Sequence, residues 1–331
     1  MKLIKSLLAV AIAGLAATGA HAAPYNGGFF TGTADGTISG LTGFDVFSNG
    51  ATAFFCASAG GCGVGNVIAS GAQLNPVALT PLKPGDLIRS VYQGVVATFN
   101  PGLSTPLLFS PGSEPVGGYQ LTVAASFYET VVTGFALGGP NPVAQASLAP
   151  LSANSRVSLF YDQAGRGDGG TLITQADVAA GTGTGYTDGL LIADGTVNQF
   201  LSLLGTVTVQ DTLAGAGVNL QASGSSNIAG NFSSVAVGDA GTNTVGFIPV
   251  PGGFESTTTL QYGDNTDGYQ VSNFFDNANG WSSVAVIKEL TERADANIDL
   301  TAAAEVPEPA TLALVGLALA GVGVATRRRK A

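Results

Sequence analysis

Histidine is almost absent from this 331-residue chain, and the single one, His21, lies in an N-terminal segment that we expect to be removed. Without an imidazole, the mature protein has no Ser-His-Asp triad, no Cys-His pair and no histidine-ligated zinc. The composition therefore excludes most hydrolase mechanisms for the mature chain.

Positive charge is also scarce between the two ends of the chain. Six of the 12 Lys and Arg residues lie within the first five or the last five residues. Segment 23–305 holds the other six against 21 Asp and Glu residues, which gives a net charge of about −15. Such a charge keeps a protein soluble, argues against nucleic acid or an anionic membrane surface as a partner, and is compatible with bound cations.

Only two cysteines occur, Cys56 and Cys62, in the stretch FCASAGGCG. Their spacing is not the C-x-x-C of a redox-active pair. In an exported protein, two such thiols favour a disulfide. Closing a loop of about seven residues stabilises the fold by roughly 2 kcal/mol in the chain-entropy model. We therefore expect a local disulfide that fixes a Gly-rich turn.

Long apolar runs occur only at the two ends. At the N-terminus, Lys2 and Lys5 precede an apolar run over 7–18, and residues 20–22 read Ala-His-Ala. A basic start, a short apolar segment and a small-residue cleavage site are typical of a secretory signal peptide. We expect the signal peptide to span 1–22 and the rest of the chain to be exported.

The C-terminal run begins with a proline-rich motif. Pro307 and Pro309 disfavour helical geometry at and before their positions, so a helix can begin only after them. Residues 310–326 carry no charge and suit a short transmembrane helix. The basic residues 327–330 are typical of a cytoplasmic flank. We expect residues 306–331 to serve sorting and not the folded domain.

The order of these parts resembles the PEP-CTERM sorting signal of Gram-negative bacteria that make exopolysaccharide. In that family a membrane-embedded transpeptidase, the exosortase, is thought to recognise the motif and remove the helix, which releases the protein to the cell surface or the matrix. The resemblance implies that Pro307, Glu308 and Pro309 are recognition residues, and that exosortase is a processing partner. The alternative is a plain single-span membrane anchor.

The exported region, 23–305, is rich in Gly, Thr, Ser, Ala and Val, as are proteins built from short strands and Gly turns. Apolar and polar residues alternate over 121–135, which predicts a half-buried strand. Similar strand patterns occur at 86–100, 155–162, 200–210 and 243–250. We predict an all-β fold, an antiparallel β-sandwich or a jelly-roll-like domain, with one or two domains left open. Segment 284–293 suits either a short helix or a strand, and 213–246 suits loops or an irregular edge.

Two Gly-rich turns carry acidic and amide side chains, whose oxygens are the ligands that Ca²⁺ prefers. Neither turn fits the EF-hand pattern, and Asp, Asn and Gly are also common in solvated turns. We predict no cofactor other than calcium at these turns. The candidate ligands are Asp162 and Asp168 in the first turn, and Asp264, Asp267 and Asp276 in the second.

A carboxylate pair is the one catalytic alternative, because glycoside hydrolases use two carboxyl groups without histidine. The mid-chain glutamates are Glu114, Glu129 and Glu255, and no signature pairs any two of them. Two carboxyl groups that face each other across a cleft at a distance of about 5–10 Å would favour an enzyme. We therefore expect a protein without catalytic activity, with a glycan-active enzyme as the alternative.

Three segments of the body, 82–101, 157–162 and 183–197, are similar to segments of the flocculation-associated subset of PEP-CTERM surface proteins. This resemblance implies a non-enzymatic surface or matrix protein that associates with exopolysaccharide in flocs or biofilm. It brings no binding residue with it.

Overall fold

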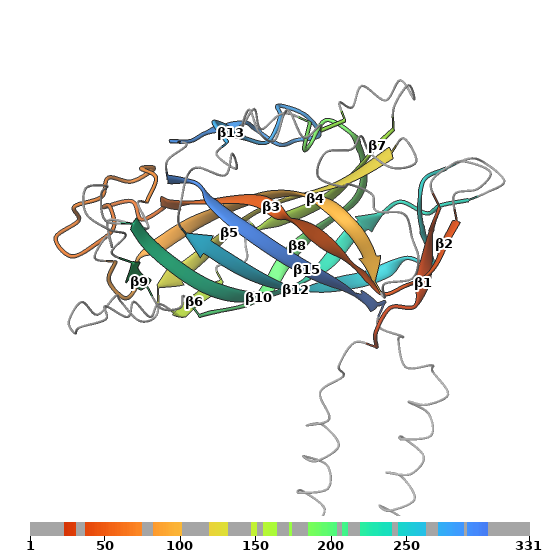
Figure 1. Ribbon diagram of the computed structural model, residues 1–331, viewed down its shortest axis with the longest axis horizontal. Helices are drawn as coiled ribbons and strands as arrows, with labels where there is room; N and C mark the ends of the chain where they lie inside the picture. The colour runs from red at the N-terminus through yellow and green to blue at the C-terminus, as the bar shows by residue number, and fades with distance from the viewer. Residues whose placement is uncertain are drawn as a thin grey trace, which may run out of the picture. The chain divides into compact units, whose positions relative to one another are not determined.

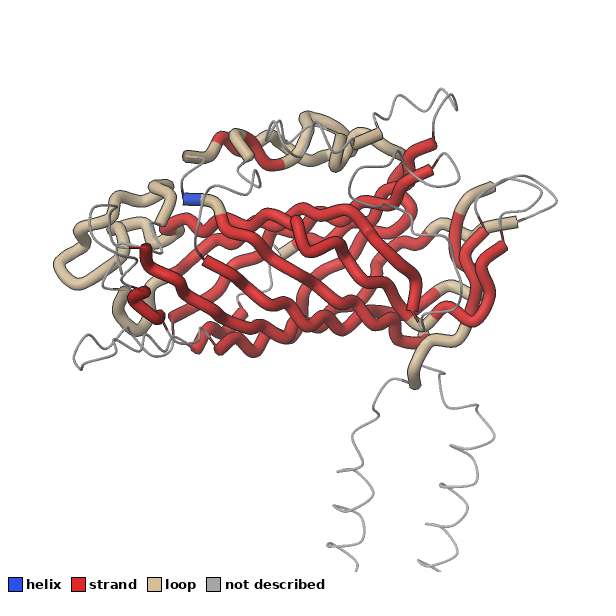
Figure 2. Tube along the Cα trace, in the orientation of Figure 1, coloured by secondary structure: helices blue, strands red, loops and turns tan. Residues whose placement is uncertain are grey.

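Strands account for most of the described residues of this computed structural model, and the one helical piece among them is a 3-10 turn at Leu290 (Figure 2). The described residues are 23–30, 37–74, 82–100, 119–131, 147–150, 155–163, 172–173, 185–203, 207–210, 219–239, 244–262, 271–287 and 290–303. The strands are β1 (Gly27–Phe30), β2 (Thr37–Leu41), β3 (Gly43–Cys56), β4 (Leu87–Asn100), β5 (Tyr119–Val131), β6 (Ser147–Pro150), β7 (Arg156–Gln163), β8 (Leu190–Leu203), β9 (Val207–Gln210), β10 (Asn219–Val235), β11 (Gly246–Ile248), β12 (Pro251–Tyr262), β13 (Asn273–Phe274), β14 (Val284–Ala285) and β15 (Glu292–Ala302).

The expected signal peptide and C-terminal helix lie outside the described residues, as do Pro307, Glu308 and Pro309. Within the described part of the chain, no helix is long and apolar enough to cross a membrane. Residues 24–302 form one compact unit.

The main sheet is antiparallel and closes on itself (Figure 1). Its ring runs β8-β7-β5-β4-β3-β15-β12-β10, and β10 pairs in turn with β8. The short strands β6 and β9 pair at its margins. The all-β prediction is confirmed, whereas the two stacked sheets of the expected sandwich or jelly roll are replaced by one barrel-like sheet.

Strand β8 accounts for this difference. It is 14 residues long, and its first part pairs with β7 while most of its length pairs with β10. Register shifts interrupt the β8–β10 ladder at Ala229/Gly230 and Phe232/Ser234. Residues 193–195 of β8 pair with β7 along one edge and with β10 along the other, so β8 joins the two ends of the sheet and closes the ring.

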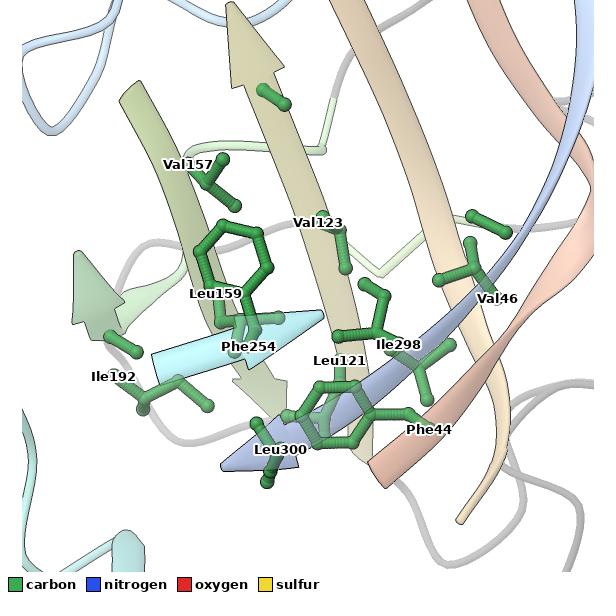
Figure 3. Packing of buried hydrophobic residues seen from close by; sticks show 14 of the residues in the cluster. Phe44, Val46, Leu121, Val123, Val157, Leu159, Ile192, Phe254, Ile298 and Leu300 are labelled. Carbon is green, nitrogen blue, oxygen red and sulfur yellow. The ribbon is translucent and has the colours of Figure 1, made fainter. Parts of the chain in front are cut away.

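The interior of the closed sheet is apolar over most of its length. Phe44, Leu121, Leu159 and Phe254 belong to one buried cluster, drawn from strands on different sides of the ring (Figure 3). One end is sealed by the small sheet β11-β1-β2, where the Phe29 ring packs 5.1 Å from that of Phe247. Burial of these side chains is the main favourable term for the fold.

Segments outside the ring cover one part of its outer surface. Residues 271–287 include the short β13–β14 hairpin, whose neighbours Phe275 and Trp281 pack on outward-facing Val91 and Phe160. Figure 1 shows this segment above β3 and β4. A side chain of β4 forms a hydrogen bond with the backbone of residues 271–287. Side chains of β5 form hydrogen bonds with the backbone of Ile173 and Tyr186, which belong to a second covering segment. The N–H of Phe275 donates to Gln93 at 2.9 Å, the N–H of Ile173 donates to Gln120 at 2.9 Å, and Thr122 donates to the carbonyl of Tyr186 at 2.8 Å.

Two sequence predictions about elements need revision. Segment 213–246, predicted as loops or an irregular edge, contains β10, a 17-residue strand paired on both sides. Small side chains suit this position, because a Cβ atom on Gly230 would lie 2.5 Å from the Phe254 ring. In segment 284–293, residues 284–285 form β14 and residues 292–293 begin β15, and none of the described residues of the segment is α-helical.

The other strand predictions agree closely with the structure. Segments 86–100 and 155–162 correspond to β4 and β7. Segment 121–135 begins within β5, and its last four residues lie outside the described part. Segment 200–210 spans the end of β8 and all of β9, and 243–250 contains β11.

Candidate functional site

The two sides of the closed sheet differ in how their outward residues are used. Strands β4, β5 and β7 are buried on both faces because segments outside the ring cover them. Strands β12 and β15 instead alternate between buried and exposed residues along most of their length. The outer surface over β10, β12 and β15 is therefore open to solvent at these exposed positions.

Polar residues on this open side stand in register across four strands. Asn227 of β10 is opposite Thr257 of β12, which is opposite Asn297 of β15, which is opposite Asp45 of β3. Neighbouring rows add Glu255 opposite Asp299, and Thr259 opposite Asp295. We call these eight residues the polar face. All are exposed except Asp45, which is partly buried.

The polar face was not predicted from the sequence, although the sequence carries a signal for it. The stretch FESTTTL in β12 and the stretch RADANIDL in β15 both alternate with period two. What the alternation alone did not give was the register that aligns the two strands.

The polar face is acidic. Glu255 and Asp299 are directly opposite each other, an arrangement that destabilises an antiparallel pair. Burial raises the pKa of Asp45, and the nearby charge of Asp295 raises it further. Strands β3, β8, β10, β12 and β15 contain one basic residue, Arg293, against six acidic ones. This side of the protein therefore repels polyanions unless cations intervene.

The predicted calcium ligands fall into two groups. Asp168, Asp264 and Asp267 lie outside the described residues. Asp276 accepts hydrogen bonds from the N–H groups of Gly185 and Thr187, at 3.1 and 3.0 Å, and so joins the two segments that cover the sheet.

Asp162 is fully buried on β7, and its carboxylate lies against Gly189. Within the described part of the chain, no three His, Cys, Asp or Glu residues gather in a way that could hold a metal ion. Calcium binding at the predicted turns therefore stays a prediction.

The candidate carboxylate pair is not assembled in the described residues. Glu129 belongs to the interior-facing row of β5 and is 1% exposed, whereas Glu255 is exposed on the outer side of β12. Glu114 lies outside the described residues. Glu129 and Glu255 thus point to opposite faces of the sheet.

Glu129 is an unusual buried acid. Its Oε1 accepts a hydrogen bond from Ser90 at 2.7 Å, and its Oε2 has no hydrogen-bond partner within the described structure. Burial raises the pKa of Glu129 to about 8, although the Ser90 hydrogen bond lowers it. The interior therefore favours the protonated carboxyl.

The predicted disulfide joins Cys56 and Cys62, with Cα atoms 5.8 Å apart. The loop that follows is held by further bonds, since the buried carboxylate of Asp86 accepts the N–H of Gly63 at 2.8 Å. Lys83 donates to the carbonyl of Gly63 at 3.2 Å. The disulfide is thus one of several constraints on a Gly-rich loop, as the sequence suggested.

Removing this disulfide is expected to lower stability without changing the fold. Replacing Cys56 and Cys62 by alanine releases a short loop, which costs about 2 kcal/mol of unfolding free energy. Urea unfolding of both proteins, followed by tryptophan fluorescence of Trp281, measures the difference. An unchanged midpoint would show that the other bonds hold the loop without the disulfide.

Comparison with known proteins identifies the C-terminal tail. Residues 305–330 match the family model of the PEP-CTERM protein-sorting motif. The match confirms the resemblance seen in the sequence, and it marks the chain as an exported protein that is processed by exosortase and sorted to the cell surface. No curated protein and no solved structure matches the chain.

Proposed function

We propose that this PEP-CTERM protein is a non-enzymatic component of the surface or extracellular matrix of a Gram-negative bacterium. In this role its polar face contacts exopolysaccharide and helps to hold cells together in flocs or biofilm. The observation that carries the proposal is the contrast between the two sides of the sheet. Covering segments shield the outer side of β4, β5 and β7, while the polar face has no covering segment among the described residues.

The chemistry of the polar face suits a carbohydrate. Hydroxyl, amide and carboxylate groups are hydrogen-bonding partners for sugar hydroxyls, and the face supplies all three. Neighbouring strands lie about 4.8 Å apart, so the row through Asn227, Thr257 and Asn297 repeats at nearly constant steps. A regular row of this kind matches a polymer with a regular repeat better than it matches a single small ligand.

The unfavourable pairing of Glu255 with Asp299 supports a role outside stability. Opposed like charges are expected to cost stability, and natural sequences keep costly features where function needs them. The separation of Glu129 and Glu255 on opposite faces supports a role without carboxylate catalysis.

Changing the central row tests the proposal. The triple variant Asn227→Ala, Thr257→Ala, Asn297→Ala removes three polar side chains from neighbouring strands and leaves the interior unchanged. Each lost hydrogen bond costs about 0.5–1.5 kcal/mol, so affinity for the exopolysaccharide of the producing strain should fall by at least about tenfold. Co-sedimentation of the purified domain with the isolated polymer measures the binding.

A matched control changes three exposed serines elsewhere, Ser70, Ser282 and Ser283, to alanine. This control should bind as the wild type does. Equal binding by both triple variants would exclude the polar face as the contact surface. Changed polymer length after gene deletion, in place of lost flocs, would favour the enzyme alternative.

Calcium is a second element of the proposal, because it would bridge the acidic protein to an acidic polymer. A site of millimolar affinity stabilises the native state by ~1.5 kcal/mol at ten times its Kd. Thermal unfolding of residues 23–305 should therefore shift upward between EDTA and ~10 mM CaCl₂. The shift should disappear in the variant Asp264→Ala, Asp267→Ala, and identical curves for the wild type would leave both turns without an ion.

A further inference from the structure

The two ends of the folded domain are bonded to each other. Pro24 forms an antiparallel bridge with Thr301, and the N–H of Tyr25 donates to the carbonyl of Leu300 at 3.1 Å. The N–H of Leu300 donates to the carbonyl of Thr42 at 2.7 Å. Tyr25 is itself buried, and its hydroxyl donates to the carbonyl of Pro249. The last strand therefore remains ordered up to the end of the sheet.

The last strand in the sequence also completes the closed sheet. β15 pairs with β12 on one side and with β3 on the other, so the ring stays open until residues 292–302 have been exported. All of its partners precede it in the chain and are exported earlier. The sheet can thus close while the sorting motif is still joined to the domain.

The distance from the sheet to the sorting motif is short. Ala302, opposite Pro251, is the last paired residue in the described part of the chain, and Pro307 follows five residues later. Five residues span at most ~18 Å when fully extended. A compact domain of this length has a radius of gyration of ~19 Å. The folded domain is therefore wider than the stretch from Ala302 to Pro307 is long. An enzyme that binds the motif must do so within ~18 Å of the end of β15.

We propose that exosortase acts on the closed domain, and that the spacer Ala303–Val306 sets whether the enzyme reaches the motif. The end of β15 then blocks access of the enzyme to the motif when the spacer is too short. The length of the spacer therefore matters more than its sequence. This inference rests on processing by exosortase, and it adds to it a structural condition supplied by the folded domain.

Spacer variants of the full-length protein in its native host test the proposal. Deleting Ala303 and Ala304 should reduce the tail-free fraction at least fivefold, whereas replacing the same two residues by Gly-Ser should leave it unchanged. Intact-mass measurement and fractionation into membrane and medium give the readouts. Normal processing of the deletion variant would overturn the proposal.

A second variant tests whether the sheet end is the obstacle. Leu300→Pro removes the N–H that bonds Thr42 and should release the last residues of β15, which lengthens the tether. In the deletion background it should restore processing. If the combined variant stays unprocessed while Leu300→Pro alone is processed, the end of β15 is not what limits access to the motif, and the proposal is overturned.

The tail motif provides an independent control. If alanines at Pro307, Glu308 and Pro309 leave processing normal, exosortase recognition fails as an explanation. The spacer results would then still report whether the folded domain limits access by whichever protease removes the tail.

Discussion

Replacing Pro307, Glu308 and Pro309 by alanine is expected to abolish removal of the C-terminal tail while export continues. Export depends on the N-terminal signal predicted over 1–22, which the change does not touch. The uncleaved apolar segment 310–326 would then hold the protein in the membrane. Immunoblots of membrane and medium, with intact mass of the recovered protein, measure the outcome.

Two other results would have different meanings for this variant. Tail-free protein at the normal level in the medium would remove the basis for recognition of the motif. Loss of the protein from every fraction would indicate degradation, which a variant with alanine only at Ser282 and Ser283, far from the tail in sequence, should not show.

The variant Glu129→Gln is expected to remove the loss of stability that this carboxyl causes between pH 4.5 and about 8. The folded-state pKa of Glu129 is raised to about 8 from 4.5, so the native state retains a proton that the unfolded state loses. Stability from this group is complete below pH 4.5, falls as the pH rises, and is lost above about 8. Each pH unit in this window costs about 1.4 kcal/mol.

The amide mimics the protonated carboxyl and keeps an acceptor for Ser90. At pH 9 the variant should therefore be more stable than the wild type by about 3–5 kcal/mol, while at pH 4 it should be less stable by at most about 1–2 kcal/mol. Urea unfolding at pH 4, 6.5 and 9 measures this. Glu255→Gln, an exposed control, should keep the pH profile of the wild type, shifted upward by at most about 1 kcal/mol because it relieves the like-charge pair with Asp299. A parallel profile for Glu129→Gln and the wild type would show that water reaches the carboxyl.

The sorting of this protein can be predicted from its residue order alone. Local residue order carries that information, since Pro307 to Pro309, an uncharged run and a basic end follow one another without any fold. It also determined the all-β class and the Cys56–Cys62 disulfide, because period-two alternation and a spacing of six residues are local features.

The way in which the strands close, and the choice of residues that share a face, depend on contacts between segments far apart in the chain. A sandwich and a closed sheet need the same alternation, and the difference lies in β8, which pairs with β7 on one edge and with β10 on the other. Likewise, Asn227, Thr257 and Asn297 lie up to 70 residues apart in the chain and are aligned only by register. No sequence signature distinguishes Glu129 from the other mid-chain glutamates, yet closure of the sheet buries it, because the face that a strand turns inward depends on its partners.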